Sequence, residues 1–498
     1  MKKVLLFLCM VMAAGHGTGQ PVNGIVYSDT LGLRVIKVWG THQQRGYALG
    51  YLTGASITAM MTNYIKPQFG AFYSSARQVI IQGNDIAIPQ LYQDEAQAVI
   101  DGMNASGTNP DNLDKTDVLV GNSLLDLANV LGKSTGQGCA SLMSWNNATA
   151  GTDLDGKSVV SRHLDWIYSG ILVNNQIMVV HFPSEQDEKK WMLIGYAGMI
   201  SALSGINEDY CAFQHVMNDY TASGFHGKQY LPVWLALRKA LEADDYNSDG
   251  SRDVQDVQSV LRDCTNGFAS GYVVSSLGRS NSVDSLVAMV AELTPTSPTH
   301  TFRYNDYDDN IPGDNLYASN FQIKRNDARN YDSRYNSVKN NIGNGTMISL
   351  DSNWNILRDH SHQSINMQFM QFAPEYDYFR IAIYRNGHAA YLNDPAVYAL
   401  SDLFADPTVS IEELKENAQV KIYPNPSGHM IYMSGIPSGD YRAEIFDLTG
   451  KRILFSARLS LQNGIDISSL NRGIYTIRLT CDQNVYTSRF VSNAQIAK

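Results

Sequence analysis

The chain has 498 residues, of which 44% are hydrophobic, and a formal net charge of −10 at pH 7. This length is ample for a hydrophobic core and predicts one large domain with one or two smaller ones. The acidic balance excludes nucleic-acid binding, which requires a basic face or stripe. Five cysteines in so long a chain also exclude a disulfide scaffold, because such scaffolds are small and dense in cysteine.

The N-terminus has the pattern of a secretory signal peptide over residues 1–19. Two lysines precede an apolar run over residues 4–14, and Gly17-Thr18-Gly19 offers small residues for cleavage. This run is too short to span a bilayer, and no later segment is long and apolar enough, so we expect no transmembrane segment. The mature protein is predicted to begin at Gln20.

Four cysteines remain after the signal peptide: Cys139, Cys211, Cys264 and Cys481. Their spacings match no zinc pattern such as Cys-x-x-Cys, and we expect no organic cofactor. Whether Cys211 and Cys264 form a bridge stays open at this point.

Residues 20–410 show mixed helix and strand patterns. Helices are predicted over residues 45–61, 93–103, 119–130 and 230–243, and strands over 35–39, 158–163, 176–181, 192–196, 212–217, 272–275 and 287–293. Helices that come first and are followed by many strands indicate an α+β fold with stacked layers.

The junction Gly138-Cys139 is the strongest chemical signal of this region. Cleavage of this bond would give Cys139 a free α-amine, whose ordinary pKa is about 7.7–8.0, so that it could serve as the general base for its own thiol. Arg162 and Asp165 follow on a predicted strand. Residues three apart on an extended strand face opposite sides, so a turn or bulge must intervene if both are to reach Cys139.

A second signal, over residues 245–256, has the spacing of an EF-hand calcium loop. Asp245, Asn247 and Asp249 stand at positions 1, 3 and 5, glycine at 6, and Ser251 at 7 would give its carbonyl. Asp256 closes the loop where many such loops have glutamate, as in the dockerin variant. We expect a structural Ca²⁺ here, against the alternative of a polar turn between two helices.

The last region, residues 417–498, follows a polar linker over 404–416 and has short alternating runs typical of a small β-sandwich. It contains Tyr423-Pro424-Asn425-Pro426, the stretch 446–451 (FDLTGK) and the stretch 465–475 (IDISSLNRGIY). These motifs resemble the C-terminal sorting domain of the type IX secretion system of Bacteroidetes. The resemblance implies the type IX machinery as a partner, and export through the periplasm and outer membrane to the medium or cell surface.

Residues 33–390 resemble the peptidase C45 group, which includes acyl-coenzyme A:6-aminopenicillanic acid acyltransferase and is related to acid ceramidase and penicillin V acylase. All are N-terminal nucleophile hydrolases. The resemblance rests on six stretches in the same order: residues 40–50 (GTHQQRGYALG), 138–141 (GCAS), 161–166 (SRHLDW), 204–208 (SGINE), 318–321 (ASNF) and 333–335 (SRY). It implies an αββα four-layer sandwich over residues 20–410 and autocleavage between Gly138 and Cys139.

The resemblance also implies roles for the site residues. Cys139 would attack the acyl carbon of a small N-acyl substrate, and its α-amine would accept the thiol proton and pass it to the leaving amine. Asp165 would hold the α-ammonium group, and Arg162 would steady the thiolate or Asp165. Arg334 would anchor a substrate carboxylate or Asp165.

Two asparagines are candidates for the oxyanion hole, where a side-chain amide faces the developing charge. The resemblance favours Asn320 over Asn207. The chain departs from the family at Ala140, His163 and Phe321, where threonine, asparagine and histidine are frequent. These departures leave the nucleophile in place and bear on specificity, and His163 is expected to point away from the site into the core.

Two other hypotheses about the function stay open. A classical cysteine protease would pair Cys139 with a distant histidine such as His300 or His360 and would need no cleavage at residue 139. A calcium-dependent surface or adhesion protein would use an inactive hydrolase fold. The leading prediction is a secreted, self-processing amidase or acyltransferase, whose acyl group and amine no motif identifies.

Overall fold

The computed structural model describes residues 20–132, 138–217, 224–280, 285–307, 310–325, 333–407, 420–437, 439–446, 452–460, 464–481 and 484–493. The predicted signal peptide and most of the predicted linker lie outside these residues. Among the described helices, none is both long and apolar enough to cross a bilayer.

The larger sheet has nine strands within the described residues, in the order β1-β2-β5-β6-β7-β8-β9-β10-β11. Neighbouring strands are antiparallel except β2 and β5, which run parallel. The strands are β1 (Gly24–Thr30), β2 (Leu33–Gly40), β5 (Gln176–Pro183), β6 (Trp191–Tyr196), β7 (Ser204–Asn207), β8 (Tyr210–Val216), β9 (Tyr272–Gly278), β10 (Ala288–Leu293) and β11 (His300–Arg303).

The second sheet has six described strands, in the order β12-β3-β4-β13-β14-β15. They are β12 (Asn315–Ala318), β3 (Cys139–Ser144), β4 (Val159–Asp165), β13 (Asn366–Ala373), β14 (Tyr378–Ile383) and β15 (Ala396–Tyr398). The candidate nucleophile is thus the first residue of β3, and β4 pairs with it in antiparallel register.

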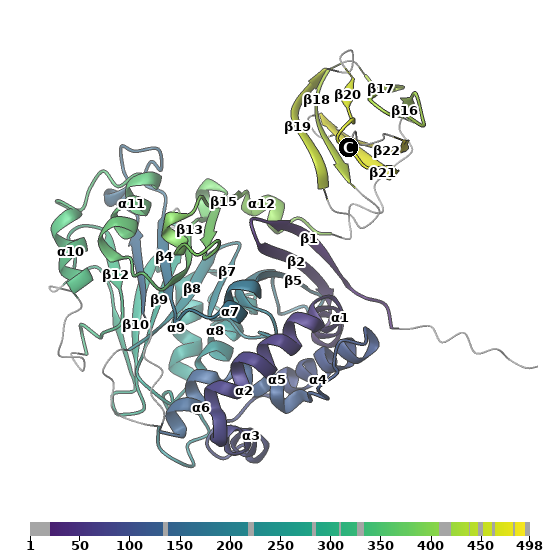
Figure 1. Ribbon diagram of the computed structural model, residues 1–498. Coiled ribbons are helices and arrows are strands. Elements are labelled where there is room, and N and C mark those ends of the chain that lie inside the picture. Colours follow the sequence, from purple (N-terminus) through teal and green to yellow (C-terminus); the bar gives the residue numbers. More distant parts are fainter. Residues whose placement is uncertain are drawn as a thin grey trace, which may run out of the picture.

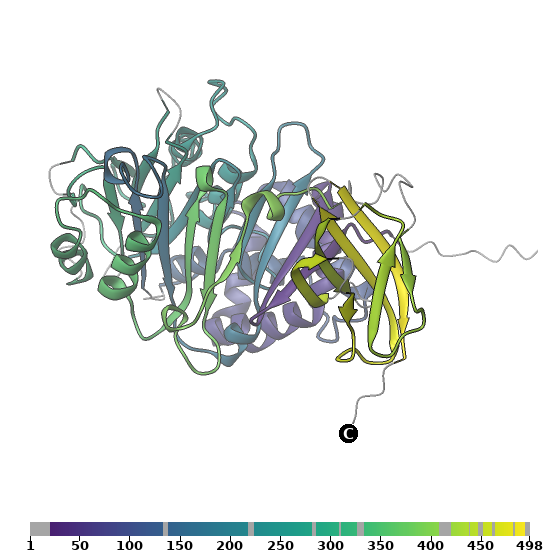
Figure 2. The same ribbon diagram turned by 90° about the horizontal axis from the view of Figure 1, so that it is seen from above.

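Helices cover the outer face of each sheet, as Figures 1 and 2 show. On the nine-stranded side the helices include α1 (His42–Met60), α2 (Lys66–Phe69), α3 (Tyr73–Gln82), α4 (Gln90–Ala105), α5 (Lys115–Asn122), α6 (Leu124–Val130), α8 (Val233–Glu242) and α9 (Val254–Asp263). On the other side are α10 (Ser333–Asn341) and α11 (Leu350–Ser361). Short helices α7 (Gly170–Asn174) and α12 (Leu400–Leu403) lie in connections.

The hydrophobic clusters define the order of these layers. Ile36 and Val179 face the helices, whereas their neighbours Val35 and Met178 face the six-stranded sheet, because successive strand residues point to opposite faces. On that second sheet, Leu142 joins a separate cluster with α10 and α11. The order is therefore helices, sheet, sheet and helices, while membership of the N-terminal nucleophile hydrolases stays a prediction.

Each predicted helix and strand of residues 20–410 overlaps an observed element, and one predicted helix is divided. The segment 119–130 forms α5 and α6, which meet at Ser123, whose backbone is not helical (φ −121°, ψ 19°). The neighbouring Asn122 explains the break, because its side chain donates to Val118 and Gly198 and accepts from the amides of Ile200 and Ser201. Tertiary hydrogen bonds thus override the helical pattern of the sequence.

The C-terminal region forms a separate β-domain with its own core, which includes Ile431, Ile445, Ile477 and Leu479. A three-stranded sheet has the order β16-β17-β20 and a four-stranded sheet the order β19-β18-β21-β22 among the described residues. The strands are β16 (Lys421–Tyr423), β17 (Met430–Ser434), β18 (Asp440–Phe446), β19 (Arg452–Ser460), β20 (Ile465–Asp466), β21 (Gly473–Cys481) and β22 (Asn484–Ser492).

A buried ionic network ties the start of α1 to α4 and to the β5–β6 hairpin. The His42 ring lies 2.6 Å from both Glu95 and Glu188, and Arg238 contacts Glu95 at 2.6 Å. Arg45 pairs with Glu188 at 2.9 Å. Ligand atoms of His42, Glu188 and Glu242 come within 4.8 Å of one another, but arginines already neutralise these carboxylates, so the network serves structure.

We expect the stability of the folded protein to fall between about pH 6.5 and pH 9. Burial lowers the pKa of His42, but its hydrogen bonds to Glu188 and Glu95 outweigh burial and raise the pKa to about 9. A pKa raised by folding stabilises the protein fully below the unfolded pKa, and this contribution, roughly 3 kcal/mol, is lost as the pH rises through the folded pKa. Urea unfolding at pH 6.5, 8 and 9.5 measures the loss.

The matched controls for this measurement are His42→Gln and His226→Gln. His226 is exposed and bonds Asp85, so its replacement should leave the decline unchanged. His42→Gln should be less stable at pH 6.5 and lose little more by pH 9.5. An equal decline in the His42 variant would assign the pH dependence to other groups.

Candidate active site

The Gly138–Cys139 junction lies in a network of hydrogen bonds from three other segments. The carbonyl oxygen of Gly138 accepts a hydrogen bond from the Asp165 amide at 2.9 Å. The backbone nitrogen of Cys139 donates to Oδ1 of Asn320, also at 2.9 Å. Cys139 is 2% exposed, so both sides of the bond are held in fixed positions inside the protein.

Arg162 is the cation nearest to the thiol. Its Nη2 lies 4.0 Å from Sγ of Cys139 and donates to the carbonyl oxygen of Gln214 at 2.9 Å. The guanidinium lies 5.3 Å from the centre of the Phe213 ring, between the two sheets. Burial raises the pKa of the Cys139 thiol, and Arg162 and Arg334 oppose this rise. The net effect raises the pKa of this thiol, so the neutral thiol is favoured in the uncleaved chain, and Arg162 limits the rise.

Two nitrogens of the same guanidinium, Nε and Nη1, are buried and have no hydrogen-bond partner among the described residues. Buried donors without partners are costly. They can therefore donate hydrogen bonds to an oxygen atom that reaches the space beside Sγ.

Asp165 ends β4 and is oriented by two partners. Asn366 donates to its Oδ1 at 2.8 Å, and Arg334 lies 3.3 Å from its Oδ2. The turn or bulge predicted between Arg162 and Asp165 is not found within β4, whose register with β3 is regular. The irregularity lies on the partner strand, where β13 places Asn366 opposite Asp165 and Gln368 opposite Leu164 and leaves one extra residue as a bulge. Of the two predicted roles for Arg334, the structure shows the contact with Asp165.

Asn320 links the α-nitrogen of Cys139 to this charge pair. Its Oδ1 accepts from Cys139 and also from Nη2 of Arg334 at 2.6 Å, while its Nδ2 donates to the carbonyl oxygen of Val216 at 2.6 Å. In this uncleaved chain Asn320 is thus an acceptor for the α-nitrogen. Because an amide group carries two N–H donors, the one not given to Val216 can face an oxyanion.

The loop that carries Asn320 is held by Glu292, a residue that the sequence analysis missed. The Glu292 carboxylate is fully buried and accepts from the amides of Ile323 at 2.9 Å, Lys324 at 3.1 Å and Arg325 at 2.6 Å. Arg303 lies 3.3 Å from the same carboxylate. A lone glutamate in a predicted strand offers no signal for this role, because the contact depends on the pairing of distant segments.

Asn207 is not brought to this site. Its Nδ2 donates to the carbonyl oxygen of Leu241 at 3.1 Å, and its Oδ1 accepts from the amides of Asp209 and Tyr210. These bonds close the β7–β8 turn and attach it to the end of α8. The Asn207 side chain therefore has a structural role, as asparagines in turns usually do.

The three histidines considered in the sequence analysis make their contacts with residues other than Cys139. His163 stacks on Phe369 at 4.1 Å and bonds the carbonyl oxygen of Leu357, on the outer face of its sheet, as predicted. His300 contacts Thr299, and His360 contacts Ser337. The structure thus gives neither histidine the contact with Cys139 that a classical cysteine protease needs. Cys211 and Cys264 are free thiols, so the bridge left open by the sequence does not form.

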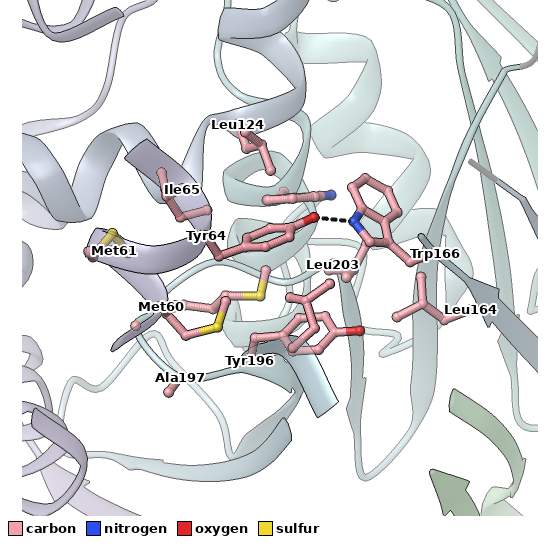
Figure 3. Close-up of a pocket in the computed structure, with 15 residues that line it drawn as sticks. Met60, Met61, Tyr64, Ile65, Leu124, Leu164, Trp166, Tyr196, Ala197 and Leu203 are labelled. Atoms are coloured by element: carbon pink, nitrogen blue, oxygen red, sulfur yellow. Dashed lines mark hydrogen bonds between the residues drawn. The ribbon is translucent and has the colours of Figure 1, made fainter. Parts of the chain in front are cut away.

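An apolar cavity adjoins the site (Figure 3). Leu164, the β4 residue opposite Cys139 in the sheet register, forms part of its wall. The other lining residues are Met60, Met61, Tyr64, Ile65, Gly121, Leu124, Trp166, Leu172, Tyr196, Ala197, Gly198, Met199, Leu203 and Trp234. Trp166 donates its indole N–H to the Tyr64 hydroxyl, which leaves the wall almost without free polar groups.

Tyr196 is a second residue that the sequence analysis missed. Its ring lines the cavity, and its hydroxyl is buried without a partner among the described residues. Burial raises the pKa of this hydroxyl, and the charges of Arg162 and Cys139 also act on it. It is therefore a neutral donor on the cavity side of the site. Its position at the end of a predicted strand offered no motif by which to recognise it.

Comparisons with known proteins bear on the tail and on a short stretch of the chain. Residues 421–493 match the family described as the secretion system C-terminal sorting domain. Protein dcd1B of Dictyostelium discoideum is 26% identical over 107 residues, which is 22% of this chain and 20% of that protein. The matched stretch thus spans about a fifth of either chain.

The tail match confirms the predicted destination. The chain carries the sorting domain of the type IX system and is exported through the outer membrane of a Bacteroidetes-type cell, to the surface or the medium. The secretion machinery is accordingly one of its partners.

Proposed function

We propose that this protein is a secreted, self-processing cysteine amidase that hydrolyses an N-acyl amide through an acyl-Cys139 intermediate. The observation that carries the proposal is the environment of Cys139. Its α-nitrogen bonds Asn320, which is joined to the Arg334–Asp165 pair, while Arg162 lies beside its thiol. An α-amine used as base and a cation near the thiol are what an N-terminal nucleophile requires.

The first step is cleavage of the chain. Sγ of Cys139 attacks the carbonyl carbon of Gly138, and the Asp165 amide, 2.9 Å from that oxygen, stabilises the oxyanion. Expulsion of the Cys139 nitrogen, which takes up the proton released by the thiol, leaves a thioester. Water then hydrolyses the thioester to a carboxylate on Gly138 and a free thiol and α-amine on Cys139.

The second step repeats this chemistry on the substrate. The α-amine removes the thiol proton, Sγ attacks the acyl carbon, and the proton passes to the leaving amine. Asn320, Arg162 and Tyr196 supply donors for the oxyanion. Water then releases the acyl group as a carboxylate. Without an acceptor amine held in place, hydrolysis should prevail over transfer.

The apolar cavity supports an acyl group that is itself apolar, because burial of apolar surface contributes about 25 cal/mol per Å². The polar edge near Cys139 would receive the amide, with the acyl chain directed between Tyr64, Trp166 and Leu203 (Figure 3).

We expect Leu203→Phe to shift the preference toward short acyl groups. The larger ring would occupy part of the cavity, so kcat/KM should fall roughly tenfold or more for an octanoyl amide and stay within about threefold for an acetyl amide. Chromogenic acyl anilides of increasing chain length measure this. Leu91→Phe, on the exposed face of α4, is the control. Parallel losses for all chain lengths would show that the cavity does not hold the acyl group.

The experiment that tests the function is mass spectrometry of the exported protein before and after incubation with an acyl amide. The expected result is a fragment that begins at Cys139 and transiently gains the mass of the acyl group, which hydroxylamine removes. An intact Gly138–Cys139 bond in a protein that hydrolyses amides would refute the mechanism. A cleaved protein that never gains the acyl mass and releases no amine would refute the activity.

A further inference from the structure

The loop over residues 245–256 lies between α8 and α9 and takes no part in the proposed amidase chemistry. Its turn uses two residues in the left-handed region, Ser248 (φ +58°) and Gly250 (φ +85°). Asn247 Oδ1 accepts from the Asp249 amide at 3.1 Å, and Asp249 Oδ1 accepts from the Ser251 amide at 2.8 Å. These bonds fold the loop back on itself, and Asn247 Nδ2 also donates to Oδ2 of Asp249 at 2.8 Å.

Two carboxylates of this loop have buried oxygens without partners. Asp256 is 1% exposed, and its Oδ1 accepts from the amides of Tyr246 at 2.8 Å and Asn247 at 3.4 Å. Its Oδ2 is buried and bonds no other group among the described residues. The same holds for Oδ1 of Asp245, whose Oδ2 accepts from the Gly250 amide at 2.9 Å. A buried carboxylate oxygen without a partner destabilises the folded protein. A bound cation would offset this cost for both aspartates.

The charges of the neighbouring basic side chains act on the loop, Lys189 on Asp256 and Arg252 on Asp245, but their ion pairs are made with other carboxylates. Arg252 pairs with Asp244 at 2.6 Å, and Lys189 lies 3.5 Å from Asp209. Both pairs use carboxylates outside positions 1, 3, 5 and 12 of the loop. The charge of Asp245, Asp249 and Asp256 therefore stays available for a bound ion.

We propose that this loop binds one Ca²⁺ ion. Side-chain oxygens of Asp245, Asn247, Asp249 and Asp256 and the carbonyl oxygen of Ser251 would be ligands, with water completing six to eight contacts. Calcium accepts this number of oxygens in flexible geometry, whereas magnesium demands a tighter octahedron and keeps its own water. A single loop of this kind, in a chain exported to the outside of the cell, fits the weak calcium sites of extracellular modules.

The ion would stabilise one corner of the catalytic domain. The end of α8 is bonded to the β5–β6 hairpin, because the Lys189 amide donates to the Glu242 carbonyl oxygen at 2.7 Å and the Asp244 amide to that of Asp187 at 2.9 Å. Since α8 also carries Trp234 of the apolar cavity, a calcium ion at its end would hold this wall at elevated temperature.

The test uses the exported, full-length protein freed of metal with EGTA. Titration with CaCl₂ should raise the melting temperature by about 3 °C once the ion is in hundredfold excess over its dissociation constant. Terbium, which replaces calcium, should luminesce on excitation of Tyr246, at position 2 of the loop, and calcium should quench this signal by displacement. Equal melting with CaCl₂ and with EGTA would overturn the proposal, as would an equal rise with MgCl₂.

Asp249→Asn is the test variant for the calcium site, and Asp101→Asn is its matched control. Asp249→Asn keeps an oxygen that can accept from Ser251 but removes a ligand charge, so it should lose the thermal shift and the terbium signal while amide hydrolysis at 25 °C continues. Asp101→Asn removes an exposed carboxylate on α4 and should keep both signals. Full calcium response in the Asp249 variant would place the ion elsewhere and refute this site.

Discussion

Replacement of Cys139 by alanine should leave the chain uncleaved at Gly138 and abolish amide hydrolysis. The substitution removes Sγ, the atom that in the proposed mechanism attacks the Gly138 carbonyl carbon and that lies 4.0 Å from Nη2 of Arg162. Loss of a catalytic nucleophile typically lowers kcat by about 10⁴-fold or more. Intact mass reports cleavage, and release of amine from an acyl anilide reports hydrolysis.

Two further variants make this result specific. Cys264→Ala removes a free, partly buried thiol outside the site and should leave both cleavage and activity unchanged. Cys139→Ser keeps a weaker nucleophile and should cleave slowly, over hours to days. Hydrolysis that persists in Cys139→Ala, in protein that melts like the wild type, would show that another residue forms the acyl-enzyme.

The second large effect is expected for Asp165→Asn, which should lower kcat/KM by roughly 10²–10⁴-fold. The variant keeps the shape of the side chain and an oxygen for Asn366, but it removes the negative charge that faces Arg334 at 3.3 Å. Arg334 would keep its hydrogen bonds to Asn320 and Ser319 but lose its ion pair. The α-ammonium group of Cys139 would lose its counter-charge. Steady-state kinetics across pH 5–9 measure the effect, because a weaker counter-charge should shift the titration of the α-amine to lower pH.

The control for this variant is Asp351→Asn, which removes the partner of Arg380 in an exposed ion pair at 3.2 Å. Exposed pairs contribute at most about 1 kcal/mol, so activity and its pH profile should stay the same. If Asp165→Asn lost activity only in proportion to its folded fraction, with an unchanged pH profile, the aspartate would be a structural residue and the proposed role would fail.

The fold elements and the chemical residues with local signals were predictable from the sequence. The helices and strands around residues 35–39, 93–103, 176–181 and 192–196 follow from periodicity, and the observed bounds agree with the predicted ones to within a few residues. The Gly138-Cys139 junction, with Arg162 and Asp165 nearby in sequence, is a local pattern that the strand pair β3–β4 brings together directly. The tail motifs likewise predicted the sorting domain that the family match confirms.

What the sequence could not decide is which distant side chains meet. Asn207 and Asn320 are equivalent as residue types, yet only Asn320 reaches Cys139, because the hydrogen bonds of the β7–β8 turn engage Asn207 while the loop held by Glu292 presents Asn320. The position of Tyr196 in the cavity wall is set by the pairing of β6 with β5 and β7.

The sequence by itself therefore determined the candidate nucleophile, the local charges, the calcium-loop spacing and the export signal, since each depends on residues close together along the chain. The tertiary structure alone decided the partners of Asp165, the role of Asn320, the unpaired donors of Arg162 and Tyr196, and the apolar cavity. Each of these depends on contacts between segments far apart in the chain, as with Arg334 and Asp165. Such contacts are set by sheet register and layer packing, which no local pattern encodes.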